Sequence, residues 1–346
     1  MKKVRILHLL SSNSYSGAEN VVCTIIENET SDYETYYCSP NGAISDILNK
    51  KKIKYIPLNK LTSKGLKKVL VDYKIDILHA HDFKASFIAG TTKFDGKIIS
   101  HIHCNPNFIK YWNPYSILYS IISKRFNHII FVSTEATKNT IFLNKIKDKY
   151  SVIQNVVNPY GVKQKSKEIE TKKYDIVFVG RLIDLKQPKL VINITNELKK
   201  VKKNIKTCII GNGELYEECE QLISELNLQN QVDLLGFKEN PFPYVKNSKI
   251  AIMPSKFEGL PMSAIECMIL NVPLLNSGAG GLKELFKKNE EFICKDEREY
   301  VNKITELLKD NKAYDKYKNA CPDIIKDFID IKAYISKINE IYKKGD

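Results

Sequence analysis

The sequence lacks the features of several protein classes. None of its eight cysteines forms a C-x-x-C pair, and most lie in apolar runs. This pattern predicts neither a zinc ribbon nor a disulfide framework and indicates a reducing compartment. No apolar run approaches the roughly 20 residues of a membrane-spanning helix, and the apolar stretch after the N-terminal KKVR is too short for a signal peptide. We therefore expect a cytoplasmic protein that could meet a membrane only from its inner face.

Two nucleotide-related signatures are also missing. The glycine turn at Gly211 and Gly213 does not complete a G-x-G-x-x-G pattern, and the expected acidic residue about 20 positions after a first glycine turn is absent. These gaps disfavour an NAD-dependent dehydrogenase. The chain has 19 Tyr and 14 Phe that could stack on bases, but no RNA-binding signature accompanies them. We therefore expect no nucleic-acid partner.

Negative charge is scarce in the first half of the chain. Residues 1–160 hold 22 Lys and Arg against 12 Asp and Glu, a net charge of +10, whereas residues 161–346 hold 32 against 28. Such a basic half favours association with phosphates, an anionic membrane face or a charged substrate. A lysine-rich composition without functional meaning would produce the same excess.

Short apolar runs alternate with helix-length amphipathic stretches along the whole chain, which predicts an α/β fold with parallel sheets covered by helices on both faces. The runs are Val4–Leu10, Ile53–Leu58, Ile75–His79, Lys97–His101, Ile129–Ser133, Ile176–Gly180, Lys206–Gly211, Val232–Leu235, Ile250–Pro254 and Val272–Asn276. The polar segment 154–173 between the two series is the predicted linker. We expect one doubly wound domain over 1–160 and another over 161–323, with a helix in 324–346 that packs back on the first.

Ligands of such sheets bind at the carboxyl ends of the strands, so the loops there are the candidate sites. In the first half, Gly17 begins a predicted helix after the first strand. Its backbone could lie close to a bound anion at the helix N-terminus, or the residue could belong to an ordinary strand-to-helix turn. Two histidine pairs, His79 with His81 and His101 with His103, follow later strands. Alternate strand residues share a face, so each pair could bind a metal or form ordinary hydrogen bonds. We favour hydrogen bonding for His79 and assign His103 as a donor to a phosphate or a sugar hydroxyl.

The second half places cationic and glycine residues after its strands. Gly180, Arg181 and Lys186 follow the first of them, and a guanidinium with an ammonium suits a diphosphate. Alternatively, Arg181 and Lys186 are ordinary surface cations of a strand-to-helix loop. Gly278, Gly280 and Gly281 form a further candidate phosphate- or sugar-facing turn after the last strand.

The most informative stretch is IAIMPSKFEGLPMSAIECM. It predicts a strand, a loop with Glu258 and Gly259, and a helix that begins at Pro261. The free amides of that first turn attract phosphate, and Glu258 and Glu266 could bind sugar hydroxyls. An exposed Glu pair is the alternative, but the apolar neighbours of Glu266 argue against full exposure.

At these residues the sequence resembles retaining glycosyltransferase family four, which has the GT-B fold of two Rossmann-like domains facing a central cleft. FVGRL with Lys186 resembles the family's Arg/Lys pair, GNG its glycine turn, and PSKFEGLPMSAIE its E-x7-E signature. The resemblance implies catalytic or donor-binding roles for the following residues: Glu258, His103, Arg181, Lys186, Gly17, Gly180, Gly213, Phe237, Ser255, Gly259, Leu260 and Glu266. It implies contact of Glu258 with the transferred sugar, of Glu266 with the ribose, and of Phe237 with the base.

The implied function is retaining, metal-independent transfer of a hexose-type sugar from a nucleotide diphosphate sugar, with uridine as the expected base. No cofactor or metal is expected. The expected acceptor is a glycan, often lipid-linked, in capsular or other cell-surface polysaccharide synthesis, and an anionic membrane is a candidate partner. A sugar-nucleotide epimerase of the same fold and a non-catalytic sugar- or nucleic-acid-binding protein are the alternatives.

Overall fold

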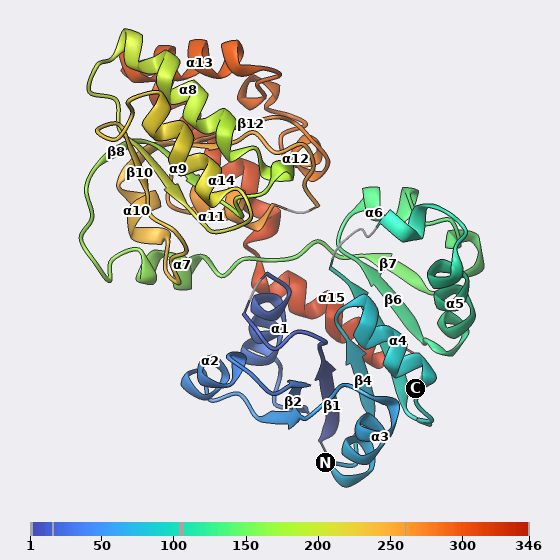
Figure 1. The fold of residues 1–346 in the computed structure, drawn as a ribbon. Helices are drawn as coiled ribbons and strands as arrows, with labels where there is room; N and C mark the ends of the chain where they lie inside the picture. Colours follow the sequence, from blue (N-terminus) through green and yellow to red (C-terminus); the bar gives the residue numbers. More distant parts are fainter. Residues whose placement is uncertain (1–2, 16, 104–106, 260, 345–346) are drawn as a thin grey trace. The chain divides into compact units, whose positions relative to one another are not determined.

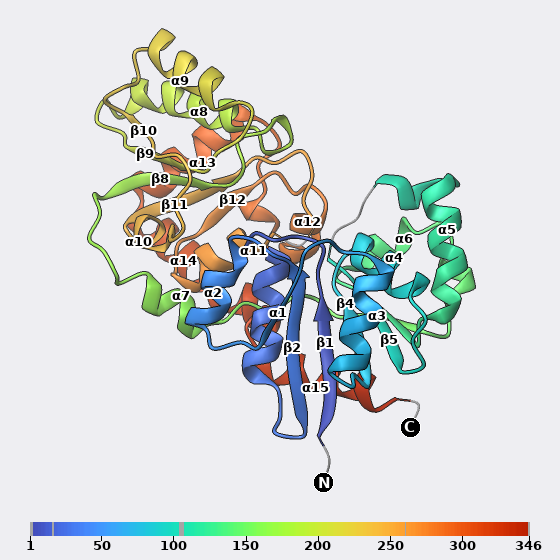
Figure 2. The same ribbon diagram turned by 60° about the horizontal axis from the view of Figure 1, so that its bottom comes forward.

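The computed structural model describes residues 3–15, 17–103, 107–259 and 261–344. The chain forms two compact units (Figures 1 and 2). Unit 1 comprises Met1–Val156 together with Asp330–Asp346, and unit 2 comprises Val157–Ile329. The final helix therefore belongs to unit 1, while residues 324–329, which the sequence analysis grouped with that helix, belong to unit 2.

Unit 1 contains a seven-stranded parallel sheet in the order β3-β2-β1-β4-β5-β6-β7. Its strands are β1 Val4–Leu9, β2 Tyr33–Pro40, β3 Tyr55–Leu58, β4 Ile77–Ala80, β5 Lys97–Ile102, β6 His128–Phe131 and β7 Tyr150–Val152. The sequence analysis missed β2, whose YETYYCSP is polar and aromatic rather than aliphatic, and the three-residue β7. The strand order reverses direction between β1 and β4, which defines the switch point of this sheet.

Helices cover both faces of the unit 1 sheet. They are α1 Gly17–Asn28, α2 Ile44–Lys50, α3 Ser63–Asp72, α4 Phe83–Thr91, α5 Pro114–Ile122, α6 Thr134–Lys138 and α15 Ile331–Lys343. Leu7 and Leu9 join the apolar core beneath α3 and α4, whereas Leu10 packs with Val22 of α1. Because strand side chains alternate, β1 residues of even number face α1 and α15, and those of odd number face the other layer.

Unit 2 has a five-stranded parallel sheet in the order β10-β9-β8-β11-β12, with its switch point between β8 and β11. The strands are β8 Tyr174–Val179, β9 Thr207–Ile210, β10 Val232–Leu234, β11 Ser248–Met253 and β12 Leu274–Asn276. The helices are α7 Pro159–Lys165, α8 Pro188–Val201, α9 Tyr216–Glu225, α10 Phe242–Lys246, α11 Met262–Ile269, α12 Gly281–Leu285, α13 Glu297–Lys309 and α14 Asn311–Ile325. Each unit is thus a Rossmann-like parallel α/β domain, which confirms the predicted fold class.

The predicted linker 154–173 is wrong in its first part. Asn158 caps helix α7 by accepting a hydrogen bond from the amide of Gly161 at 3.1 Å, and Pro159 occupies the first helical turn. Val157 and Val162 are buried in the core of unit 2. The polar composition of the segment reflects the exposed side of a short helix, and the stretches before and after α7 are irregular.

No helix among the residues that the structure describes is long and apolar enough to cross a membrane.

Candidate functional site

The unit 2 switch point brings Lys186 and Glu258 together. Lys186 ends a 3-10 helix (Asp184–Lys186) after β8, and Glu258 lies in the loop after β11. The Lys186 ammonium donates to both carboxylate oxygens of Glu258 at 2.6 Å. The side chains are only 19% and 7% exposed, so this ion pair is largely desolvated. Ser255, itself buried, donates from its hydroxyl to Glu258 Oε1 at 2.6 Å and thereby fixes the carboxylate further.

Glycines lock the surrounding loops against one another. A Cβ at Gly280, where φ is +60°, would lie 2.1 Å from the carbonyl oxygen of Glu258, and the amide of Gly281 donates to that oxygen at 2.9 Å. A Cβ at Gly213 would lie 2.4 Å from the carbonyl oxygen of Leu182. These glycines therefore permit close backbone packing that positions Glu258 and the β8 loop. Glycine is required at these two positions by the protein's own backbone, not by a bound ligand.

Gly259 differs from these packing glycines. A Cβ there would meet nothing within 4 Å, and its φ is outside the left-handed region. Gly17, at the start of α1 in unit 1, has the same two properties. Neither packing nor backbone conformation within the described residues requires glycine at either position, which is the pattern expected where another molecule approaches the backbone.

Arg181 lies five residues before Lys186 in the loop after β8, and its guanidinium has no partner within the described residues. It is exposed, and no ion pair or side-chain hydrogen bond engages it within the described residues. Gly180, which precedes it, donates its amide to the carbonyl of Ile210, so the backbone that carries Arg181 is anchored to β9. A guanidinium on an anchored backbone is available for an anionic ligand.

Glu266 lies on α11 with its side chain partly exposed. Burial raises the pKa of this carboxyl to about 7, and the charge of Lys165 opposes that rise. No hydrogen bond within the described residues satisfies the carboxyl. The helix begins at Met262 with Pro261 as its N-cap, one residue later than predicted, and Leu260 lies outside the described residues.

Phe237 follows Gly236, whose φ is +65°, after strand β10. Its ring is 72% exposed, an unusual state for a phenylalanine. The ring therefore offers an apolar face at the carboxyl end of the unit 2 sheet, where a planar group could stack.

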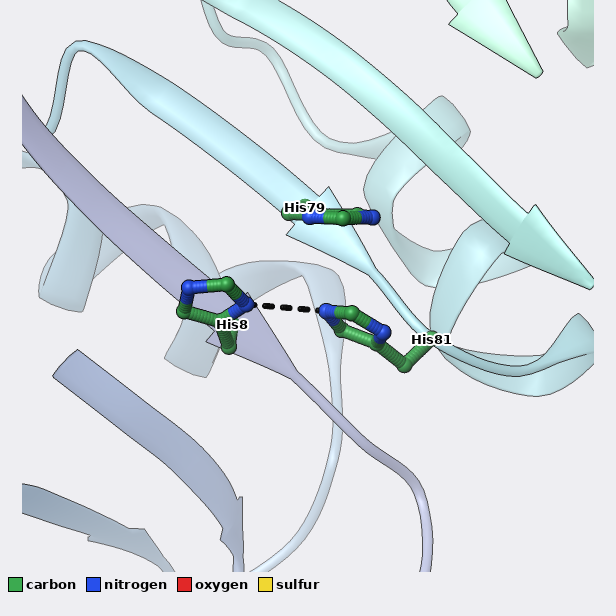
Figure 3. Close-up of side chains that lie close together, drawn as sticks. All are labelled: His8, His79 and His81. Atoms are coloured by element: carbon green, nitrogen blue, oxygen red, sulfur yellow. Dashed lines mark hydrogen bonds between the residues drawn. The ribbon is translucent and has the colours of Figure 1, made fainter. Parts of the chain in front are cut away.

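Five histidines gather where strands β1, β4 and β5 end, and Figure 3 shows three of them, His8, His79 and His81. His8 of β1 lies opposite His79 of β4 in the strand register, and His81, His101 and His103 continue the group. Nδ1 of His8 lies 2.9 Å from Nε2 of His81, and Nδ1 of His81 lies 3.1 Å from Nε2 of His103. As strand alternation predicts, the rings within each pair lie close together, with centroids 3.9 Å apart for His79 and His81 and 4.0 Å apart for His101 and His103. Sequence reasoning missed His8, because a single histidine inside an apolar strand carries no spacing signal.

Desolvation keeps these rings neutral. It lowers the pKa of His8 to about 3 and that of His103 to about 4, with Asn155 opposing the shift at His103. The pKa values of His79, His81 and His101 are also well below the ordinary value, for the same reason and because neighbouring histidines repel a second charge. The hydrogen bond predicted for His79 exists: its Nδ1 lies 2.8 Å from the hydroxyl of Tyr342 in α15.

Comparison with known proteins identifies the family. Residues 161–322 match the family model described as glycosyl transferases group 1, and residues 16–160 match the model described as glycosyltransferase family 4. The two matches adjoin and together span most of the chain. The chain belongs to the glycosyltransferases.

This glycosyltransferase is 22% identical over 306 residues to the capsular polysaccharide biosynthesis glycosyltransferase CapH of Staphylococcus aureus, with 84% of each chain covered. It is 31% identical over 189 residues to an N-acetylgalactosamine-N,N'-diacetylbacillosaminyl-diphospho-undecaprenol 4-alpha-N-acetylgalactosaminyltransferase of Campylobacter jejuni. That match covers 53% of this chain and 51% of the relative. The match to a further curated relative covers 40% of that relative's length, so the chain spans about half the length of these two relatives or less. The fold is similar to that of Anabaena HepE in its complex with UDP, with a TM-score of 0.83, 18% identity and coverage of 98% and 99%.

Proposed function

We propose that this glycosyltransferase moves a hexose-type sugar from a uridine diphosphate sugar to an acceptor glycan, with retention of anomeric configuration. The observation that carries the proposal is the desolvated Lys186–Glu258 pair at the switch point of unit 2, next to the uncrowded backbone of Gly259. A polar pair fixed at this edge of an open α/β sheet lies where ligands bind such folds. The complexes of the similar Anabaena protein with UDP and UDP-glucose support uridine as the base.

The donor diphosphate is assigned to Arg181, Lys186 and the backbone around Gly259. Arg181 offers the unengaged guanidinium, and Lys186 has one N–H beyond the two that its contacts with Glu258 use. The first amides of α11 add donors without intrahelical acceptors. These groups supply positive charge at the diphosphate, so in this proposal the transfer step requires no divalent ion.

The remaining donor contacts follow from the chemistry of each side chain. Glu266, with an unsatisfied and partly buried carboxyl, is assigned to the ribose hydroxyls, which would donate to it. The exposed ring of Phe237 is assigned to the uracil face. His103 of unit 1 is assigned to a phosphate or sugar hydroxyl. Ser255 acts as a positioning residue, because its hydroxyl is already engaged by Glu258.

The proposed reaction proceeds by attack of an acceptor hydroxyl on the anomeric carbon from the face that the diphosphate leaves. The bond between that carbon and the phosphate oxygen breaks, and its electron pair stays on the departing diphosphate. The acceptor proton passes to that oxygen. Arg181, Lys186 and the amides stabilise the developing negative charge, and Glu258 stabilises the positive charge that develops on the sugar.

The donor assignment can be tested by thermal unfolding with a panel of nucleoside diphosphates. A ligand at 100 times its dissociation constant adds about 2.7 kcal/mol of stability, a shift of several degrees. We expect UDP to stabilise the wild type, Arg181→Met to reduce the shift strongly, and the matched control Arg298→Met, an exposed arginine of α13, to preserve it. Absence of any nucleotide effect would refute the donor site.

Retention is a separate claim with its own measurement. Nuclear magnetic resonance of the product reports the anomeric configuration through its one-bond and three-bond couplings. A product of the same configuration as the donor supports the reaction proposed here. An inverted product would overturn it while leaving the donor site intact.

A lipid-linked acceptor at an anionic membrane is the proposed setting. Helix α5 of unit 1 supports it because apolar side chains lie on its outer face as well as its inner one: Tyr119 and Ile122 are buried, while Ile117 and Ile121 are 46% and 57% exposed. A helix that is apolar on its outer side requires an apolar environment there. Trp112, half exposed before α5, lies 4.9 Å beneath the Lys145 ammonium, and Lys124 and Lys138 are exposed nearby in sequence. Aromatic and basic residues beside an apolar face suit an anionic lipid surface. The names of the Staphylococcus and Campylobacter relatives, a capsular enzyme and a diphospho-undecaprenol enzyme, agree with this setting.

Membrane binding can be measured by co-sedimentation with vesicles of phosphatidylglycerol and phosphatidylcholine. We expect binding that rises with the anionic fraction and falls with salt. The double variant Ile117→Ser/Ile121→Ser should lose it, whereas Val71→Ser, which removes an exposed valine from α3, should not. Equal binding of the two variants would refute the role of α5.

A further inference from the structure

The histidine cluster of unit 1 contains ring nitrogens that the protein leaves without a partner. Among the residues that the structure describes, Nε2 of His8, Nε2 of His79 and both nitrogens of His101 are buried and make no hydrogen bond. No carboxylate bonds to any of the rings in the same set of residues. Buried polar atoms are ordinarily paired, so unpaired atoms concentrated at one point indicate a partner that the chain itself does not supply.

The surroundings restrict what that partner can be. The side chains of His8, His79 and His81 have no solvent exposure, so the partner must be as small as an ion or a water molecule. An imidazole binds a metal through the ring nitrogen that carries no proton, so each of the three rings can offer one ligand atom. The cluster also straddles β1 and β4, the switch point at which open α/β sheets bind ligands.

We propose that His8, His79 and His81 bind one transition-metal ion, of the class that prefers imidazole ligands and of which Zn²⁺ is the simplest probe. One ring nitrogen of each residue lies within 4.8 Å of those of the others. Figure 3 shows His8 and His81 joined by their hydrogen bond and the His79 ring, seen edge-on, next to them. Zinc–nitrogen bonds of about 2.0–2.1 Å at tetrahedral angles place ligand nitrogens roughly 3.3 Å apart, so small side-chain movements complete the site. Three histidines leave a fourth position for water or an anion.

Two of the three existing hydrogen bonds suit this assignment, and the ion replaces the third, between His8 Nδ1 and His81 Nε2. His79 can keep its proton on Nδ1 and donate it to the Tyr342 hydroxyl, which leaves Nε2 for the ion. His81 can donate from Nδ1 to His103 Nε2 and bind through its own Nε2. His8 then carries its proton on Nε2 and binds through Nδ1, the atom that faces His81. Of the unpaired nitrogens the ion therefore engages Nε2 of His79, while Nε2 of His8 and the His101 ring lie next to the site. Metal-bound histidines typically donate the other ring N–H to such a partner, so Tyr342 and His103 are positioning residues of the site.

The experiment measures bound metal in the full-length chain. The protein is unfolded in urea with a chelator, refolded with excess Zn²⁺ or Co²⁺, desalted, and assayed by mass spectrometry of the elements. We expect about one ion per chain, and for Co²⁺ the visible absorption of a tetrahedral nitrogen site. Wild-type protein that retains no Zn²⁺, Co²⁺, Ni²⁺ or Cu²⁺ would overturn the proposal.

Variants locate the ion. His81→Gln should abolish stoichiometric binding, whereas His128→Gln, at a histidine outside the cluster that lies 2.9 Å from Ser151 Oγ, should preserve it. If His81→Gln does not fold, Tyr342→Phe keeps the ring that packs on His79 and removes only the hydroxyl. We expect it to weaken metal affinity about 10- to 100-fold, the usual effect of losing such a partner. Unchanged affinity in the folded variant would refute the site. None of these readouts depends on glycosyl transfer.

Discussion

The two units solve the same topological problem with opposite electrostatics. In each, side chains from the two strands at the switch point meet at the carboxyl edge of the sheet: His8 with His79 in unit 1, and Lys186 with Glu258 beyond β8 and β11 in unit 2. Unit 1 buries bases as neutral rings, whereas unit 2 buries the charged Lys186–Glu258 pair and holds a partly exposed acid, Glu266, whose pKa is raised. Unit 2 contains no histidine at all. The same fold position therefore can exclude charge or concentrate it, and the two units should respond oppositely to pH.

The largest difference in stability between the two units should appear at acid pH. The cluster histidines have folded pKa values below 6.5, so the unfolded state binds more protons once the pH falls beneath that value. The stability of unit 1 that is present above pH 6.5 is then lost as the pH falls toward 4, by several kcal/mol in total. Hydrogen exchange, corrected for intrinsic rates, should show β1, β4 and β5 losing protection before β8 and β11. Uniform loss in both units would contradict the comparison.

The next largest effect should follow from breaking the ion pair of unit 2. Lys186→Met leaves the Glu258 carboxylate buried without its cation, which costs about 3–5 kcal/mol. The double variant Lys186→Met/Glu258→Gln should recover most of that loss, because no charge is then stranded. Urea unfolding of the wild type, both single variants and the double variant gives the coupling energy. Additive effects would mean that the pair does not interact as described.

Glu266→Gln should increase the stability of unit 2 at alkaline pH. The folded pKa of Glu266 is raised to about 7, so its favourable contribution is complete below the unfolded value of 4.5 and is lost as the pH rises through 7. We therefore expect the variant to be more stable than the wild type by about 1–3 kcal/mol at pH 8 and nearly equal to it at pH 5. Thermal unfolding at the two pH values measures this, and a difference that is independent of pH would exclude the desolvated carboxyl.

The smallest effect on stability should come from Phe237→Ala. The ring is already 72% exposed, so its removal should change the unfolding free energy by less than about 0.5 kcal/mol. The affinity for UDP should nevertheless fall about tenfold, within the range for loss of a base-stacking ring. Tyr160→Ala, a 71% exposed aromatic residue of α7, is the matched control and should leave UDP affinity unchanged. Calorimetric titration compares the two.

Sequence reasoning predicted the fold because aliphatic runs mark strands that are buried on both faces. It failed where that signal is weak: β2 is rich in tyrosine, and α7 is a short polar helix within the predicted linker. It also identified the loop residues of both units as site candidates. What it could not provide were the partners. That Lys186 binds Glu258, or that Tyr342 reaches His79 across 263 positions, depends on long-range packing that local patterns do not encode.

The sequence likewise could not separate the two kinds of glycine. Gly213, Gly259 and Gly280 all follow strands and precede helices in similar local sequences. Only the structure shows that Gly213 and Gly280 accommodate neighbouring carbonyl groups, while nothing within the described residues crowds Gly259. A Gly-rich loop in a sequence therefore predicts close approach of something, and the coordinates decide whether it is the protein's own backbone.

Helix α15 has a consequence for biosynthesis. Most of unit 1 precedes unit 2 in the chain, but helix α15, which packs on its histidine face, is translated after the whole of unit 2. At about 5–20 residues per second, the 263 positions between His79 and Tyr342 correspond to roughly 13–50 seconds on the ribosome. During that interval the histidine face of the unit 1 sheet has α1 but lacks α15. Tyr342 is added only after unit 2 has been translated, so a polypeptide interrupted before α15 would contain a finished unit 2 and a histidine cluster that lacks this tyrosine.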